Sequence, residues 1–199
     1  MNIYAISDLH LSFDTDKPMD IFGASWENYT QTIKENWSQT VNDDDIVLLA
    51  GDLSWAMTLQ DALKDLEYIA ALKGKKIIIK GNHDYWWSSI SRLREALPQN
   101  VFALQNDSIK IGNYVICGTR GWTCPEGDNL SEQDRKIYDR EALRLEMSLK
   151  NMSKIRGEDD TAIALMHFPP FNSRREQSLF TQLFQKYNID SVVYGHIHG

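Results

Sequence analysis

The sequence predicts an α/β fold in which strands alternate with helices. Short apolar runs rich in β-branched residues recur along the chain, and most are followed by a segment with apolar residues at helical spacing. The clearest run is Ile77 to Ile79, three consecutive isoleucines that favour a buried strand. Five of these runs stop abruptly at polar residues. This pattern is typical of layered α/β domains, which bind ligands beyond the carboxyl ends of their strands.

Length and composition narrow the class of protein. A chain of 199 residues fits one domain, residues 1–199, with a full hydrophobic core. The net charge of −7 argues against an extended nucleic-acid surface. Two cysteines, Cys117 and Cys124, and the lack of a secretory leader predict a cytoplasmic protein. No apolar run approaches the ~18 residues of a membrane span, so no membrane partner is expected.

The predicted elements follow one another in order along the chain. Strands are expected at 2–7, 45–50, 77–79, 161–167 and 192–198. Helices are expected near 26–37, from Thr58 to Gly74, at 89–97, from Ser131 to Ile155, and near 180–187. Both Thr58 and Ser131 have an aspartate three residues on, which favours helix capping. Three short runs, 101–104, 108–111 and 114–117, are expected to belong to a second sheet.

Each of the five main strands ends in residue types that bind metal ions, and all five histidines of the chain lie at these ends. Asp8 and His10 stand two apart, so in extended backbone their side chains would leave on the same face. Taken singly, such residues are more often structural. Because such residues recur in five loops, a shared metal site becomes more probable than five separate structural uses. The candidates are Asp8, His10, Asp52, Asn82, His83, Asp84, His167, His196 and His198.

The series D-x-H, G-D, G-N-H-D, a strand-end His and G-H-x-H, in this order over residues 8–198, resembles the calcineurin-like metallophosphoesterases. The resemblance implies a four-layer α/β/β/α sandwich with two mixed sheets. It also implies two metal ions, one held by Asp8, His10 and His198 and one by Asn82, His167 and His196, with Asp52 bridging both. His83 would be the catalytic histidine and Asp84 its orienting carboxylate. Because His198 falls one residue before the last, Gly199, we expect the native protein to continue with further strands.

The chemistry of the candidate residues agrees with these roles. The ligands are oxygen and nitrogen without thiolate, which favours Mn, Fe, Zn or Co, with Mn or Fe preferred. Two such ions can hold a hydroxide for attack on phosphorus, while His83 protonates the leaving group. We therefore expect hydrolysis of a small phosphomonoester or phosphodiester. A nuclease of the same family, or a noncatalytic interaction module on the same fold, is the alternative.

The sequence gives a less specific signal for the residues that contact substrate than for the metal ligands. Arg120, Arg174 and Arg175 could bind phosphate oxygens, but solvated loop arginines are equally common. The aromatic run 85–87 could wall a pocket, although packing beneath the sheet is the more frequent use of such residues.

Overall fold

Two four-stranded sheets and five α-helices form the part of the chain that the computed structural model describes, residues 1–17, 19–23, 26–127 and 130–197. This mixed α/β fold is the class that the sequence predicts, and it is consistent with the expected metallophosphoesterase fold. The chain divides into two compact units. The first contains residues 1–78 and 82–103, and the second contains residues 79–81 and 104–199.

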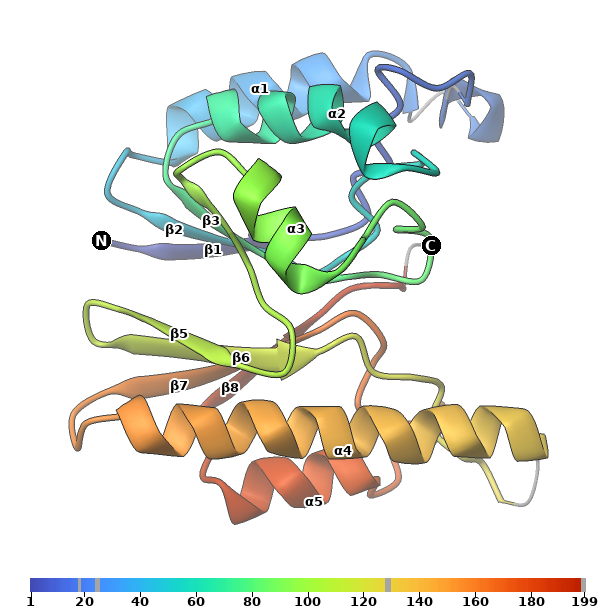
Figure 1. Ribbon diagram of the computed structural model, residues 1–199, viewed down its shortest axis with the longest axis vertical. Coiled ribbons are helices and arrows are strands. Elements are labelled where there is room, and N and C mark those ends of the chain that lie inside the picture. The colour runs from blue at the N-terminus through green and yellow to red at the C-terminus, as the bar shows by residue number, and fades with distance from the viewer. Residues whose placement is uncertain (18, 24–25, 128–129, 198–199) are drawn as a thin grey trace. The chain divides into compact units, whose positions relative to one another are not determined.

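The sheet of the first unit has the strand order β1-β2-β3-β4. Its strands are β1 (Ile3–Ile6), β2 (Ile46–Leu49), β3 (Lys75–Ile78) and β4 (Val101–Ala103). The connections carry α1 (Tyr29–Thr40), α2 (Leu59–Ala71) and α3 (Ile90–Ala96). Because each crossover through a helix returns the chain to the same end of the sheet, all of these strands pair in parallel rather than in the mixed arrangement expected. Helices α1 and α2 lie together over one face of this sheet (Figure 1).

One strand lies in a different sheet from the one expected. The run that begins at Val101 forms β4 and pairs with β3, whereas the sequence placed it in the second sheet. The α3 crossover explains the difference, because it brings the chain back alongside β3. A run of three strand residues carries no signal of which sheet it will join.

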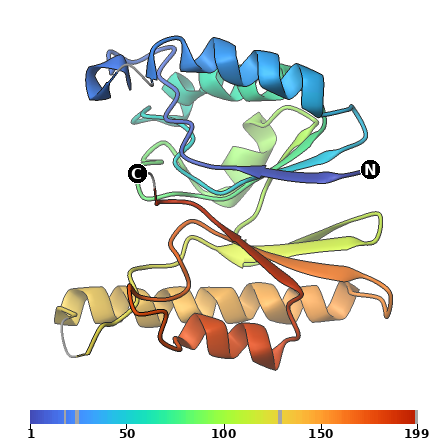
Figure 2. The same cartoon turned by 180° about the vertical axis from the view of Figure 1, so that it is seen from behind.

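The sheet of the second unit has the order β5-β6-β7-β8. Its strands are β5 (Ser108–Ile111), β6 (Tyr114–Thr119), β7 (Thr161–Met166) and β8 (Ser191–Tyr194). The β5–β6 hairpin is antiparallel, and the pairs β6–β7 and β7–β8 are parallel, so this sheet is mixed as expected. Helices α4 (Glu132–Ile155) and α5 (Leu179–Lys186) connect the parallel strands and lie side by side on one face, as the view from behind in Figure 2 also shows.

Local sequence signals account for the starts of the two longest helices, α2 and α4. Thr58 caps α2 by accepting a hydrogen bond from the Asp61 N–H, and Ser131 caps α4 in the same way from Asp134. Most of the apolar stripe expected for α4 packs in a core cluster. Helix α2 instead buries Ala62, Leu66 and Ile69, and of its expected stripe of Leu59, Leu63, Leu66 and Ala70 only Leu66 is buried. Among the described helices, none combines the length and the apolar character that a membrane span requires.

The ends of the first three strands are in register, and this alignment prepares a site. Ile6 pairs with Leu49, and Leu49 pairs with Ile78, each being the last residue of its strand. The loops that follow β1, β2 and β3 therefore begin in one row at the carboxyl edge of a parallel sheet. Ligands commonly bind at this edge in α/β proteins.

A buried lysine joins β3 to the end of α2. The side chain of Lys76 is fully buried, and its ammonium donates hydrogen bonds to the carbonyl oxygens of Ala70, Leu72 and Gly74. These carbonyls close the helix, where a positive charge is favourable. Burial nevertheless lowers the pKa of Lys76 to about 8, because the charged form is poorly solvated in the core.

This lowered pKa predicts a rise in stability with pH. Between about pH 8 and the ordinary lysine pKa near 10.4, the unfolded chain binds a proton that the folded protein has released. The free energy of unfolding of the natural protein should therefore rise relative to that of Lys76→Met over this range. Urea unfolding of both proteins at intervals from pH 7 to 10 would measure the difference. A falling difference would show that the three carbonyls outweigh burial and raise the pKa.

Candidate metal centre

The loops that follow β1 and β2 run side by side and are joined through their backbones. The Asp8 N–H donates to the Gly51 carbonyl at 3.0 Å, and the His10 N–H donates to the Asp52 carbonyl at 3.0 Å. Leu11 continues this ladder of backbone hydrogen bonds: its N–H donates to the Leu53 carbonyl, and its carbonyl accepts from the Trp55 N–H. The two loops thus behave as a short extension of the parallel sheet, which fixes the spacing of the side chains they carry.

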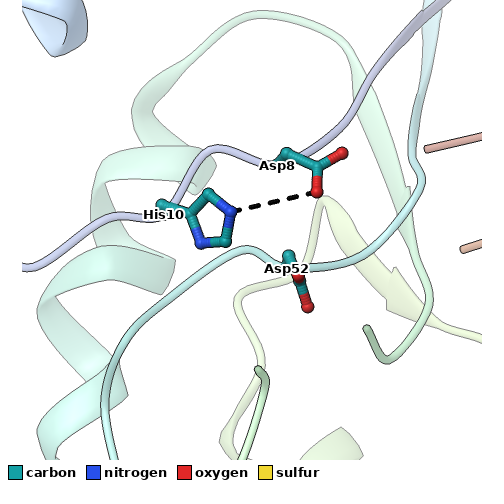
Figure 3. A group of neighbouring side chains, drawn as sticks. All are labelled: Asp8, His10 and Asp52. Carbon is teal, nitrogen blue, oxygen red and sulfur yellow. Dashed lines mark ion pairs between the residues drawn. The ribbon is translucent and has the colours of Figure 1, made fainter. Parts of the chain in front are cut away.

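Three predicted ligands converge at this ladder. Ligand atoms of Asp8, His10 and Asp52 all lie within 4.8 Å of one another, and the three residues are buried (Figure 3). The His10 Nε2 atom lies 3.9 Å from Asp8 Oδ1. Two carboxylates and an imidazole offer the oxygen and nitrogen atoms that suit a divalent transition-metal ion. The described part of the chain therefore contains a candidate metal cluster made of residues that the sequence predicts.

The backbone at these residues is left-handed. The φ angles are 56° at Asp8, 46° at His10 and 52° at Asp52. Gly51, which directly precedes Asp52, has a φ of 89°. The sequence argument assumed extended backbone for the D-x-H pair, and that assumption is wrong, although the side chains do meet. Left-handed backbone costs a non-glycine residue about 1 kcal/mol or more, and such residues concentrate at functional sites.

Two aspartates join the loop after β2 to the loop after β3 by hydrogen bonds in opposite directions. The Asp52 carboxylate accepts a hydrogen bond from the His83 N–H at 2.8 Å, and the Asp84 carboxylate accepts one from the Asp52 N–H at 2.9 Å. We call this pair of bonds the reciprocal clasp. A carboxylate has about four lone-pair sites, so the bond from His83 is compatible with cation binding by Asp52.

Asp84 organises the whole loop after β2. Besides Asp52, its fully buried carboxylate accepts hydrogen bonds from the N–H groups of Leu53 (2.8 Å) and Ser54 (3.2 Å) and from the Trp86 indole (2.9 Å). These bonds make Asp84 a positioning residue for the loop that carries Asp52. Its expected role in orienting the His83 ring stays a prediction.

A second buried carboxylate, that of Asp65 on α2, holds the loops that follow β1 and β2. Asp65 accepts hydrogen bonds from the Phe13 N–H at 2.9 Å and from the Ser54 hydroxyl. Burial raises the pKa of Asp65 above its ordinary value, while these two bonds oppose the rise. The sequence analysis missed this residue. The available signal was an aspartate within the core-facing stripe of a helix, beside Leu66 and Ile69.

Aromatic rings surround the two histidines of the first unit. The Trp55 ring stacks on His10, with centroids 4.7 Å apart at 19°, and lies 4.7 Å from the His83 ring at 53°. Tyr85 lies 6.4 Å from His83 and is exposed, whereas Trp86 is buried in the core. Trp55 therefore limits the rotation of both imidazoles, and packing is the main use of Trp86.

Two further predicted ligands meet in the second unit. The rings of His167, after β7, and His196, after β8, have centroids 5.1 Å apart. The backbone N–H groups of His167 and Phe168 both donate to the Arg120 carbonyl, at 3.1 and 2.9 Å. His196 has a φ of 70°, so left-handed backbone recurs at a predicted ligand here too. His198 lies outside the described residues.

Glu141 on α4 is a second residue that the sequence analysis missed. Its buried carboxylate accepts hydrogen bonds from the Thr119 hydroxyl at 2.9 Å and from Arg144 at 2.7 Å, and it lies 3.5 Å from Arg120. Glu141 thereby holds the loop after β6, whose Arg120 carbonyl supports His167. The signal is the same as for Asp65, a carboxylate in the apolar stripe of a helix.

The predicted residues thus form two groups in the structure. Asp8, His10 and Asp52 lie together, with His83 and Asp84 bonded to Asp52, and the half-buried Asn82 precedes His83 in the same loop. His167 and His196 form the other group. Acidic and imidazole ligands gathered at the ends of parallel strands define a candidate metal-dependent enzyme.

The chain belongs to the calcineurin-like phosphoesterase family, whose sequence model matches residues 1–199. This match confirms the resemblance inferred from the five motifs. The family assignment and the cluster at Asp8, His10 and Asp52 together support a metal-binding phosphoesterase.

Proteins similar to this chain include one protein known from its sequence and two solved structures. An uncharacterised protein of Methanocaldococcus jannaschii is 33% identical over 87 residues, which are 41% of this chain and 46% of that protein, so the match spans about half of that relative. The structure of a phosphopantetheinyl hydrolase from Mycobacterium tuberculosis has a TM-score of 0.54 at 16% identity, covering 98% of this chain and 82% of that chain. It therefore has a similar fold. A protein of unknown function from Aquifex aeolicus has a TM-score of 0.45 at 21% identity, covering 96% and 88%.

The bonds to Asp84 predict a large structural effect of its removal. Asp84→Ala would leave three backbone N–H groups and an indole N–H without this acceptor, and should lower the free energy of unfolding by about 3 kcal/mol. Urea unfolding would measure the change, with the exposed Asp139→Ala on α4 as the matched control, for which less than about 0.5 kcal/mol is expected. A loss below about 1 kcal/mol for Asp84→Ala would contradict the positioning role.

Proposed function

We propose that this protein is a dinuclear metal-dependent phosphoesterase that hydrolyses a small phosphomonoester or phosphodiester. The observation that carries the proposal is the buried cluster of Asp8, His10 and Asp52 at the carboxyl ends of parallel strands, in a chain of the calcineurin-like phosphoesterase family. The absence of a thiolate from the ligand set favours Mn or Fe, with Zn or Co as the other candidates. The low cysteine content favours a cytoplasmic location.

The proposed ligand set extends the cluster with the remaining motifs. In this proposal Asp8, His10 and His198 hold one ion, Asn82, His167 and His196 hold the second, and Asp52 is shared. A shared carboxylate is chemically reasonable because each of its two oxygens can bind one cation. The order of the five motifs in the sequence and the convergence of the described ligands within each unit support this assignment.

The side chains of this chain would then divide the reaction between them. Two bound ions supply Lewis acidity and a nucleophile derived from water at neutral pH. His83, fixed by its N–H bond to Asp52 and by Trp55, donates a proton to the departing alcohol oxygen. The Asn82 amide, in the same loop, stabilises negative charge that develops on the phosphate oxygens. Asp84 holds the Asp52 loop in place during these steps.

Asp52 offers the most direct test of a dinuclear centre. Asp52→Ala should reduce the metal content of protein reconstituted with Mn²⁺ from about two ions per chain to nearly none, because a shared ligand is lost from both positions. Elemental analysis after gel filtration would measure the content, with Asp139→Ala as the control that keeps both ions. Retention of two ions by Asp52→Ala would refute the bridging role.

His83 should affect turnover without affecting metal content. His83→Ala is expected to keep both ions and to lower kcat by about 10²-fold to 10⁴-fold. Because a poor leaving group needs more help from an acid, the loss should be larger for phenyl phosphate than for p-nitrophenyl phosphate. Steady-state kinetics on both esters, with EDTA-treated protein as the blank, would measure the difference.

Two results would contradict this role. An equal loss on both esters would show that His83 does not protonate the leaving group. If the natural protein bound two ions but hydrolysed no monoester or diester, the interaction-module alternative would be favoured over catalysis.

A further inference from the structure

The loops that follow β7 and β8 line a cavity of about 570 Å³ within the second unit. Its volume lies in the range of small-molecule pockets. These are also the loops that carry two predicted metal ligands, since Pro169 comes two residues after His167 and Ile197 comes directly after His196. The lining residues are Pro169, Phe171, Asn172, Ser173, Arg175, Tyr194 and Ile197.

One wall of the cavity is apolar and aromatic. The rings of Phe171 and Tyr194 meet edge to face, with centroids 5.5 Å apart at 85°. Tyr194 is 39% exposed and Ile197 is 70% exposed, so apolar surface faces the solvent in the cavity. Such a wall gains free energy when it covers a ring or an aliphatic chain.

The Asn172 side chain holds the loop after β7, which lines the cavity, in shape. Its side-chain amide donates to the Pro125 carbonyl at 2.8 Å, and its side-chain oxygen accepts from the N–H groups of Arg174 and Glu176, each at 3.1 Å. The loop is therefore ordered by its own hydrogen bonds. A preformed pocket binds its ligand with less loss of conformational entropy.

The structure distinguishes among the three arginines that the sequence offered as phosphate-binding candidates. Arg174 forms ion pairs with Glu126 at 2.9 Å and with Glu176 at 3.7 Å, so its charge is neutralised. Arg120 lies beside the buried carboxylate of Glu141. Only Arg175 among the three lines the cavity.

Arg175 lies in a turn at the cavity, and its guanidinium carries a positive charge. Its N–H donates to the Asn172 carbonyl at 2.9 Å, and its φ of 58° places it in the left-handed region. In the described part of the chain, its guanidinium makes no ion pair with a carboxylate. A positive group next to an aromatic wall suits a ligand that combines a ring with a negative group.

We propose that this cavity, the Arg175 pocket, selects phosphoesters whose alcohol portion carries an aromatic ring and a second phosphate. The ring would lie against Phe171 and Tyr194, and the second phosphate would pair with the Arg175 guanidinium, which fits phosphate through two N–H groups. The inference rests on the proposed function and deepens it by naming the substrate class. It makes Arg175 a specificity-determining residue that takes no part in the bond-breaking step.

Binding tests the pocket in a background of slow turnover, which His83→Ala supplies, because both nucleotides used here are themselves phosphomonoesters. Isothermal titration of the Mn²⁺-loaded His83→Ala protein should show about tenfold tighter binding of thymidine 3′,5′-bisphosphate than of thymidine 5′-monophosphate, because only the former carries a second phosphate. Arg175→Asn should abolish this preference, since asparagine tolerates left-handed backbone but carries no charge. Arg174→Asn, with the same loss of charge one residue earlier, should keep the preference. Equal affinities in the His83→Ala protein, or a preference that survives the added Arg175→Asn, would overturn the proposal.

Turnover separates this inference from the proposed function. The p-nitrophenyl ester of thymidine 5′-phosphate can be compared with the same ester carrying a 3′-phosphate. The natural protein should hydrolyse the second ester with about tenfold higher kcat/KM than the first, and Arg175→Asn should bring the ratio of the two kcat/KM values to about one. Tyr194→Ala should lower kcat/KM for both esters and keep their ratio. A ratio that Arg175→Asn does not change would overturn the pocket.

The two arms fail in different ways. If the natural protein releases p-nitrophenolate from neither ester, but the His83→Ala protein binds the bisphosphate more tightly and the added Arg175→Asn removes this preference, the proposed hydrolysis fails and the pocket stands. If both esters are cleaved at equal rates and bound with equal affinity, the hydrolysis stands and the pocket fails.

Discussion

The candidate metal centre of the first unit depends on the reciprocal clasp between the loops after β2 and β3. In the proposed site Asp52 presents its carboxylate to a cation, yet it lies in a turn with left-handed backbone at its own position and at Gly51. The bonds between Asp84 and Asp52, and between Asp52 and His83, fix this turn from both sides. Because each loop supplies a carboxylate to the backbone of the other, neither loop can move alone. Displacing one would leave buried N–H groups without acceptors, at a cost of about 1–3 kcal/mol each.

The clasp also explains how strained backbone can persist at the predicted ligands. Left-handed conformations at Asp8, His10 and Asp52 together cost several kcal/mol, by the usual figure of roughly 1–2 kcal/mol for each residue. Glycine would adopt these angles without strain, but glycine has no ligand atom. The parallel ladder between the two loops and the carboxylates of Asp84 and Asp65 supply the compensating bonds. At Asp8, His10 and Asp52, strained backbone therefore coincides with a predicted ligand side chain and with hydrogen bonds that hold the loop.

The sequence predicted the type of most elements and the three residues of the candidate metal cluster, because both leave periodic or repeated signals. Apolar runs ending in Asp8, Asp52 and His83 mark strand ends, and parallel strands in register bring those ends to one edge. The sequence could not assign Val101–Ala103 to a sheet, because pairing depends on where the α3 crossover returns the chain. It also could not predict the left-handed angles at Asp8 and His10, since these follow from hydrogen bonds to residues more than forty positions away.

The residues that the sequence analysis missed share a physical reason for their burial. A loop that carries metal ligands directs side-chain oxygen and nitrogen atoms toward a cation, so its backbone N–H and hydroxyl groups need acceptors elsewhere. In the first unit Asp65 of α2 supplies an acceptor to Phe13 and Ser54, and in the second unit Glu141 of α4 supplies one to Thr119. Both carboxylates lie on the core-facing stripe of the helix that covers the sheet, where an apolar residue would be expected. A buried charge is unfavourable unless it is paired or hydrogen-bonded. Asp65 meets that condition through the loops that donate to it, and Glu141 meets it through Thr119 together with Arg144 of its own helix. In a phosphoesterase of this kind, an acidic residue within an apolar helical stripe is therefore a sign of a supported loop, and it points to the site even though it takes no part in the reaction.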